Sequence, residues 1–201
     1  MAETNITIAI SSFKKSDDPS TEAFGFWVYL MSDAVIFTLL FATYLTMIGN
    51  TNGGPSSREL FDLRNAFHET LLLLLSTLTC GFTLLSANSG KKIGAIMWLV
   101  ITFTLGLNFV LLEYHEFFGM IHKGAGPDRS GFLSAFFTLV GTHGLHVSVG
   151  LLWLLVMLIQ IGTKGLTVAV HSRLYRFSMF WHFLDLIWVG IFSAVYLLGV
   201  L

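Results

Sequence analysis

The chain has 201 residues, of which 54% are apolar and 11% charged, and its formal net charge is −1. A soluble domain carries about 25% charged residues, so this sequence has too few charges to cover a surface that faces water. The composition excludes an ordinary soluble domain and an intrinsically disordered chain. The near-zero net charge provides no basic surface for nucleic acid. The one cysteine, Cys80, cannot form a disulfide within the chain.

The chain begins with a polar segment and continues as an apolar domain. Residues 1–23 carry charges of both signs and predict a flexible cytoplasmic arm. This arm lacks the basic start and following apolar stretch that mark a signal peptide. We therefore expect the first apolar run to stay in the membrane, with residues 24–201 forming one transmembrane domain.

Long runs without Asp, Glu, Lys or Arg predict helices that cross a membrane. Such a helix needs about 20 apolar residues to span a hydrocarbon core of about 30 Å. The runs are continuous and do not alternate between polar and apolar residues, which favours helices over a β-barrel. The sequence therefore predicts an all-α integral membrane bundle of five transmembrane helices at about 24–48, 67–88, 93–114, 131–161 and 177–200.

The basic residues between the spans predict the orientation. With the N-terminus inside, the inner segments would hold seven Lys and Arg residues, and the outer loops would hold four. An excess of Lys and Arg marks the cytoplasmic side of a membrane protein. We therefore expect an N-in/C-out topology.

Ionisable side chains inside the apolar runs are the candidate functional residues. A charge at the bilayer centre costs about 2.5–3.5 kcal/mol on the insertion scale, so each such group needs a partner or a purpose. Two pairs, His143 with His146 and His182 with Asp185, are three residues apart and share a helix face. The buried polar candidates, each with a potential role in proton chemistry, are Asp33, Glu69, Glu113, His143, His146, His182 and Asp185.

Three hypotheses compete for these side chains. The histidines could bind haem or a metal, but the chain has no repeated histidine pair on two helices and no cysteine cluster. Asp33 could be a proton-relay or transport site, because it is an isolated carboxylate within a span. The third and favoured hypothesis is that the groups form hydrogen-bonded pairs between helices or contact a neighbouring subunit. The sequence shows no soluble-type catalytic motif, so we expect no active site in this chain.

Four stretches of the apolar domain combine polar and aromatic residues: FGFWVYLMSD (24–33), LLEYHEF (111–117), GTHGLHV (141–147) and WHFLDLIW (181–188). Together they resemble subunit III of the haem-copper terminal oxidases. The longer run GPDRSGFLSAFFTLVGTHGLHV (126–147) is most similar to the cytochrome o ubiquinol oxidase branch. The resemblance covers residues 24–200.

This resemblance implies a function that composition cannot give. It implies a non-catalytic subunit III of a proton-pumping quinol terminal oxidase of the aerobic respiratory chain, in the bacterial inner membrane. The implied partners are subunit I, which carries the haem and copper, other oxidase subunits and membrane lipid, with no nucleic acid. This chain would then hold no catalytic, metal or redox cofactor site of its own. It would stabilise subunit I and support proton uptake, partly through phospholipid held in a cleft.

The resemblance also assigns individual positions. Asp33 matches the reagent-reactive buried acid of the family, which is Glu in the cytochrome c oxidase form. That form also has seven helices, whereas this chain has room for five. The remaining matches are Glu113 in the LEYxEF motif, His143 and His146 in the GxHGxH pair, and His182 and Asp185 in the terminal WHFxD motif.

Two other classes of protein remain open as alternatives. The first is an independent proton-coupled membrane transporter that uses Asp33. The second is a haem-binding membrane anchor that uses the histidines. Partner association and an optical spectrum would separate these alternatives from an oxidase subunit.

Overall fold

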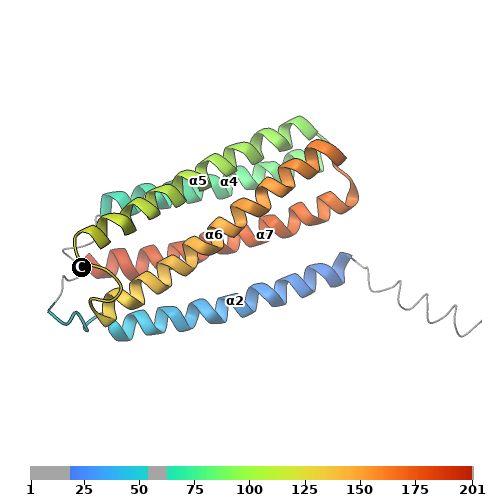
Figure 1. The fold of residues 1–201 in the computed structure, drawn as a ribbon. Helices are drawn as coiled ribbons and strands as arrows, with labels where there is room; N and C mark the ends of the chain where they lie inside the picture. Colours follow the sequence, from blue (N-terminus) through green and yellow to red (C-terminus); the bar gives the residue numbers. More distant parts are fainter. Residues whose placement is uncertain (1–18, 54–62, 201) are drawn as a thin grey trace, which may run out of the picture. The chain divides into compact units, whose positions relative to one another are not determined.

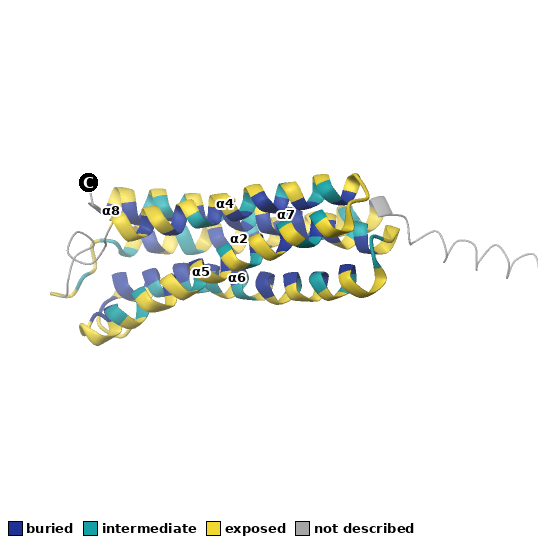
Figure 2. Ribbon diagram, turned by 90° about the horizontal axis from the view of Figure 1, so that it is seen from above, coloured by how far each residue is buried: buried dark blue, intermediate teal, exposed yellow. Residues whose placement is uncertain are grey.

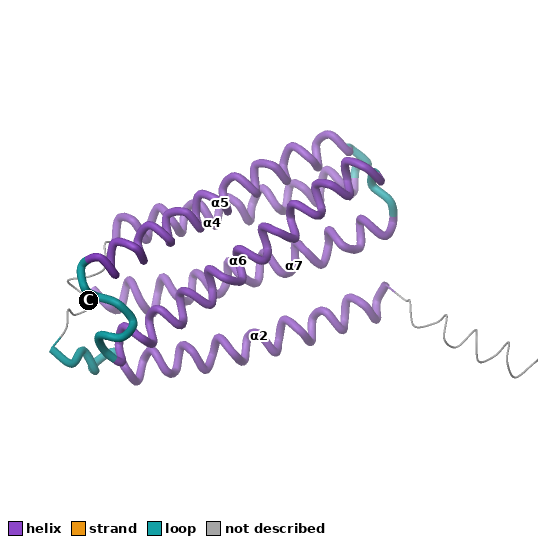
Figure 3. Tube along the Cα trace, in the orientation of Figure 1, coloured by secondary structure: helices purple, strands orange, loops and turns teal. Residues whose placement is uncertain are grey.

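The computed structural model describes residues 19–53 and 63–200. Most of the predicted cytoplasmic arm, residues 1–18, lies outside the described residues. The described ranges contain helices and their connecting turns, with no strand (Figure 3). This secondary structure confirms the all-α fold class predicted from the continuous apolar runs.

Within residues 19–53 and 63–200, five long helices follow one another (Figure 1). Each is long and apolar enough to cross a membrane, in agreement with the five predicted spans. The N-in/C-out orientation stays a prediction. The helices are α2 (Pro19–Met47), α4 (Leu63–Asn88), α5 (Lys92–His122), α6 (Gly131–Lys164) and α7 (Val168–Ile191), and α7 continues through a π-helical turn, η2 (Phe192–Leu197), into α8 (Leu198–Val200).

The helices extend further into their polar ends than the charge pattern predicts. Helix α5 continues from the predicted end at 114 to His122, and α7 begins at Val168 instead of 177. Charge-free runs mark only the apolar part of a helix, whereas backbone hydrogen bonds continue through polar residues. The starts of α6 and α7 are capped, because the side chains of Ser130 and Thr167 accept hydrogen bonds from the backbone N–H groups of Leu133 and Val170.

The chain divides into two compact units, residues 1–35 and residues 36–201. In the second unit, α5 packs against α4 and α6, and α7 packs against α6 and α4, so these four helices form a closed ring of neighbours. Buried and exposed residues alternate along each of these helices (Figure 2). The last part of α2 also belongs to this unit, where Tyr44 contacts Phe132 of α6. The unit therefore has one core, shared by four complete helices and the end of α2.

Two glycines allow a tryptophan to fill the centre of this core. A Cβ atom added at Gly106 of α5 or Gly150 of α6 would lie 2.9 Å from the Trp181 ring, which is too close for any side chain. The Trp181 indole N–H donates a hydrogen bond of 3.0 Å to the Ser76 hydroxyl of α4. Nearby small residues on α4 and α5 complete a group that we call the serine–threonine cluster: Ser76, Thr79, Thr102 and Trp181.

Candidate functional site

Three glutamates from α4 and α5 lie together in the second unit, and we call them the carboxylate cluster: Glu69, Glu113 and Glu116. They are close enough to interact electrostatically with one another. Glu69 and Glu113 are only 1% and 5% exposed. The Oε2 atom of Glu69 and both carboxyl oxygens of Glu113 have no hydrogen-bond partner among the described residues. The cluster therefore holds buried acceptors that the chain itself does not satisfy, which is rare in folded proteins.

Local features of two other helices make room for this cluster. A Cβ atom at Gly144 of α6 would lie 2.7 Å from both carboxyl oxygens of Glu113, so the carboxyl group occupies space that only glycine leaves free. Tyr196 lies in the π-helical turn η2 and is buried. Its phenol O–H donates a hydrogen bond of 3.5 Å to Oε2 of Glu116. Short π-helical turns occur frequently at functional sites, and this one brings the last helix to the cluster.

A cavity of about 500 Å³ opens beside the cluster between α4 and the end of α5. Buried Glu69 and half-buried Glu116 form part of its wall. Carboxyl oxygens accept several hydrogen bonds when ionised and donate one when protonated, so this cavity can hold a proton, water or a cationic group. The residues that line it are Asn65, His68, Glu69, Leu112, His115, Glu116, Gly119, Met120 and Lys123.

His143 lies fully buried among aromatic rings. Its ring centroid is 5.2 Å from that of Trp188, 5.9 Å from that of Phe109 and 6.4 Å from that of Phe37. Neither ring nitrogen has a hydrogen-bond partner in the described part of the chain. The Trp188 indole N–H donates to the Thr70 hydroxyl at 3.1 Å, which fixes the ring that stacks on His143. The aromatic environment explains the ring's position but leaves its nitrogens unsatisfied.

The other predicted residues of α6 and α7 do not join the carboxylate cluster. His146 donates from Nδ1 to the Thr142 carbonyl at 2.7 Å, and His182 donates from Nδ1 to the Ser178 carbonyl at 2.7 Å. Each histidine therefore uses one ring nitrogen for a hydrogen bond to a backbone carbonyl of its own helix. Asp185 is buried and interacts electrostatically with His182. The His182 side chain is exposed on the surface of this chain.

Asp33 belongs to the first compact unit and is therefore described apart from the other candidates. It lies on α2, one turn after Tyr29, and the Tyr29 phenol lies beside its carboxyl group. The remaining six predicted residues belong to the second unit. Of these six, the structure brings Glu69 and Glu113 together from two different helices, whereas His143 with His146 and His182 with Asp185 are neighbours on one helix each.

Sequence reasoning missed Glu116, Gly144 and Tyr196. Glu116 could have been found, because it lies three residues after Glu113 on the same helix face. Gly144 forms a small-xxx-small pair with Ser148, a sequence signal for close helix approach, but that signal does not say which group approaches. No sequence signal marked Tyr196, because its role depends on how the last helix approaches α5. In the described ranges, no group of three or more His, Cys, Asp or Glu side chains is placed to hold a metal ion.

Comparison with known proteins shows that most of the chain is similar to subunit III of terminal oxidases. Residues 19–200 match the family described as cytochrome c oxidase subunit III. The chain is 51% identical to cytochrome bo(3) ubiquinol oxidase subunit 3 of Pseudomonas aeruginosa over 185 residues, which are 92% of this chain and 88% of that protein. It is 42% identical to quinol oxidase subunit 3 of Bacillus subtilis over 175 residues, 87% of this chain and 86% of that protein. Cytochrome c oxidase subunit 3 of Bacillus sp. strain PS3 is 44% identical over 175 residues, 87% of this chain and 84% of that protein.

Proposed function

Because the chain belongs to the cytochrome c oxidase subunit III family, we propose that it serves as the non-catalytic subunit III of a proton-pumping quinol oxidase. The observation that carries this proposal is its similarity to subunits 3 of quinol oxidases over about nine-tenths of its length. As a subunit III it has other oxidase subunits as partners. The complex would lie in the bacterial inner membrane, as part of the aerobic respiratory chain, with the N-terminus of this chain inside.

In this proposal the chain packs against subunit I, which carries the haem and copper, and stabilises it. It also supports proton uptake into that subunit. Asp33 is the candidate residue for such a role, because it is a carboxylate within a membrane span and a carboxylate there is costly unless it has a function. The chemistry of oxygen reduction would take place in subunit I, and this chain would carry no electrons.

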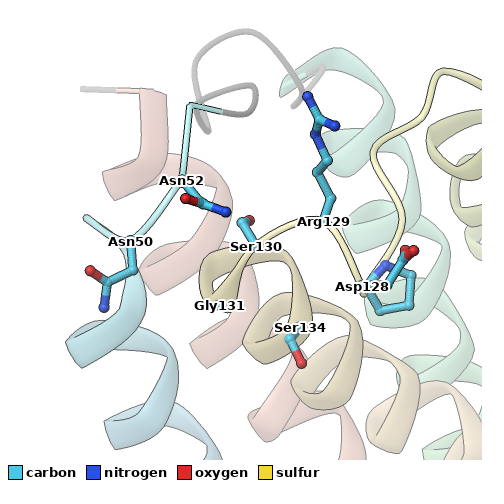
Figure 4. Close-up of a pocket in the computed structure, with 8 residues that line it drawn as sticks. Asn50, Asn52, Asp128, Arg129, Ser130, Gly131 and Ser134 are labelled. Carbon is cyan, nitrogen blue, oxygen red and sulfur yellow. The ribbon is translucent and has the colours of Figure 1, made fainter.

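A phospholipid is the third component of the proposal, and two adjoining cavities support its position. They measure about 550 and 240 Å³ and share Gly131 and Ser134 at the start of α6. Figure 4 shows Asn50, Asn52, Asp128 and Arg129 among the residues that line the larger cavity. The smaller cavity continues along α2 and α6 past Leu40, Thr43, Met47, Ala135 and Thr138.

The larger cavity has a mainly polar lining and the smaller cavity a more apolar one, as expected for sites that hold the head group and an acyl chain of one lipid. Arg129 and the positive N-terminal end of the α6 dipole favour a phosphate group at the larger cavity, although the Asp128 carboxyl group also lines it. The apolar side chains of the smaller cavity suit an acyl chain. We expect Arg129→Gln to reduce the phospholipid retained by the purified chain in native mass spectrometry. Lys164→Gln, at the far end of α6, is the matched control, and equal lipid retention by both variants would contradict this assignment.

Partner association is the direct test of the main proposal. The tagged chain is purified from its own membranes in mild detergent, its partners are identified by mass spectrometry, and an optical spectrum is recorded. We expect a much larger oxidase subunit to co-purify and haem absorption to follow that subunit. The chain freed from its partners should show no Soret band. A self-contained homo-oligomer that moves protons, or a haem band in the isolated chain, would contradict the proposal.

A substitution at Asp33 tests the proton role in the assembled oxidase. Asp33→Asn removes the charge but keeps the size of the side chain, so we expect unchanged haem content and, at most, slower proton delivery. Asp33→Glu is the control that retains the carboxyl group. Complete loss of oxygen reduction in a fully assembled Asp33→Asn complex would show that the chain has more than a supporting role.

A further inference from the structure

One face of α5 runs from Asn108, in the middle of the helix, to the α4–α5 cavity. Asn108, Leu112, His115 and Gly119 follow at spacings of four, three and four residues, which places them on one side of a helix. The last three also line the cavity beside Glu69 and Glu116. We call these four residues, of which Asn108 and His115 have polar side chains, the α5 stripe.

Asn108 is exposed in the middle of this span. It lies 16 residues from Lys92 and 14 from His122, and so about 20–25 Å from either end of α5. Its Nδ2 group donates to the Thr104 carbonyl at 2.8 Å, but the chain provides no donor for its Oδ1 atom within the described ranges. Hydrocarbon contains no hydrogen-bond donors, so this oxygen would be unsatisfied against lipid.

Glu69 gives a second, independent indication at the other end of the stripe. It is almost completely buried, its Oε2 atom has no partner in the described residues, and it lines the cavity. Lys123 lies at the same cavity but does not pair with this oxygen. Glu116 and Glu113 place two more carboxyl groups nearby. The site is therefore complementary to a cationic side chain delivered from outside the chain.

We propose that the α5 stripe and the cavity receive a transmembrane helix of another oxidase subunit. That helix brings a Lys or Arg side chain to Glu69 and Glu116, and a hydroxyl or amide donor to Asn108. Asn108 and Glu116 are eight residues apart, or about 12 Å along α5. The partner helix must therefore carry its polar donor and its basic residue about two turns apart.

A protein helix fits these requirements better than a lipid does. A lipid head group can reach a cavity near the end of a helix, but its acyl chains offer nothing to Asn108 at the middle of the span. Polar contacts between transmembrane helices satisfy such groups. The inference rests on the proposed function, because it takes the partner to be a subunit of the same oxidase.

Site-specific cross-linking in the intact oxidase tests the inference. A photoreactive amino acid replaces Asn108 or Leu112 in separate variants, and Leu145, which is exposed on α6, in the control. We expect the first two positions to cross-link to one helix of one oxidase subunit, which carries a Lys or Arg about two turns from a polar residue. The control position should not give that product.

The outcomes separate this inference from the proposed function. If the haem-bearing subunit co-purifies but positions 108 and 112 cross-link only to lipid or to a second copy of this chain, the inference is wrong and the proposed function stands. If no oxidase subunit co-purifies, the proposed function itself is wrong.

A charge substitution gives a second readout that does not depend on the cross-linker. Glu69→Gln removes the carboxyl group that can ionise beside a cation, with almost no change in shape. We expect the cross-linked subunit to be retained about tenfold less in the purified complex, because one partner of a buried charge pair is lost. Glu22→Gln, at an exposed position in the first turn of α2, is the matched control. Retention of that subunit at the wild-type level by Glu69→Gln would overturn the charge pairing.

Discussion

The serine–threonine cluster and the carboxylate cluster lie on the same helices, yet they satisfy their polar atoms differently. In the first cluster, Thr79 and Thr102 share a hydrogen bond of 2.8 Å, and Thr79 also donates to the Ser76 carbonyl. In the second cluster, oxygens of Glu69 and Glu113 have no partner within the described ranges.

The difference follows from the chemistry of the side chains. A hydroxyl group can donate to a backbone carbonyl three or four residues earlier on its own helix. An ionised carboxylate only accepts, and the N–H groups of a helix interior are already bonded. Buried hydroxyl groups can therefore find hydrogen-bond partners within the bundle itself. Buried carboxylates need a bound proton, a water molecule or a donor from another molecule. Four substitutions sharpen or break this comparison.

The largest loss of stability is expected for Trp181→Ala at the centre of the serine–threonine cluster. The change leaves a cavity between α5 and α6 and removes the bond to Ser76, so we expect a loss of about 3–5 kcal/mol in the free energy of unfolding. Thermal or SDS unfolding in detergent micelles measures it. Trp181→Phe, which keeps a ring but not the indole N–H, should lose much less. Equal losses from both variants would show that packing does not dominate at this position.

The next effect is expected for Gly144→Ala beside the carboxylate cluster. The new methyl group would collide with both Glu113 carboxyl oxygens, so we expect a loss of about 1–3 kcal/mol. Gly141→Ala on the same helix is the control, because its Cβ atom would meet only Phe117 at an ordinary 3.6 Å. A double-mutant cycle with Glu113→Ala should recover most of the loss. Without that recovery, the close approach to Glu113 is not the cause.

A smaller effect, opposite in sign, is expected for His143→Phe. The substitution keeps an aromatic ring against Trp188 and Phe109 and removes two buried nitrogens that have no partner. We expect the unfolding free energy of the isolated chain to rise by about 1 kcal/mol, since the cost of burying unpaired polar atoms disappears. His143→Gln is the comparison, because it keeps polar atoms but loses the ring. A clear loss of stability in His143→Phe would indicate that water or another group satisfies the imidazole.

The smallest effect is expected for Thr79→Val, which removes the hydroxyl bond to Thr102 without changing the side-chain shape. Single polar contacts between transmembrane helices contribute about 0.6 kcal/mol on average, so we expect a loss of this size in SDS unfolding. Thr104→Val is the control, because the exposed Thr104 hydroxyl bonds only to its own helix at the Val100 carbonyl. A loss above about 2 kcal/mol would place the hydroxyl pair among the main determinants of the bundle.

Sequence patterns predicted the spans well and the helix ends less well. The charge-free runs predicted five crossings because a membrane span requires about 20 consecutive apolar residues, whatever the neighbouring helices do. The same runs could not show that α7 begins at Val168. The helix includes polar residues before the apolar run, and its start is capped by the Thr167 side chain. The candidate list included Glu69 and Glu113 because a carboxylate in an apolar run is unusual by itself.

The sequence by itself determined the fold class, the number of spans and the separate ionisable candidates. Each of these depends on local composition or on the spacing along one helix. Only the tertiary structure decided that Glu69 of α4 meets Glu113 and Glu116 of α5, that Gly144 makes room for a carboxyl group, and that Tyr196 reaches the cluster. Helical periodicity places residues on a common face, but it does not say which face turns toward which neighbour. Packing between helices settles that choice, here through close contacts such as those of Gly106 and Gly150 with Trp181.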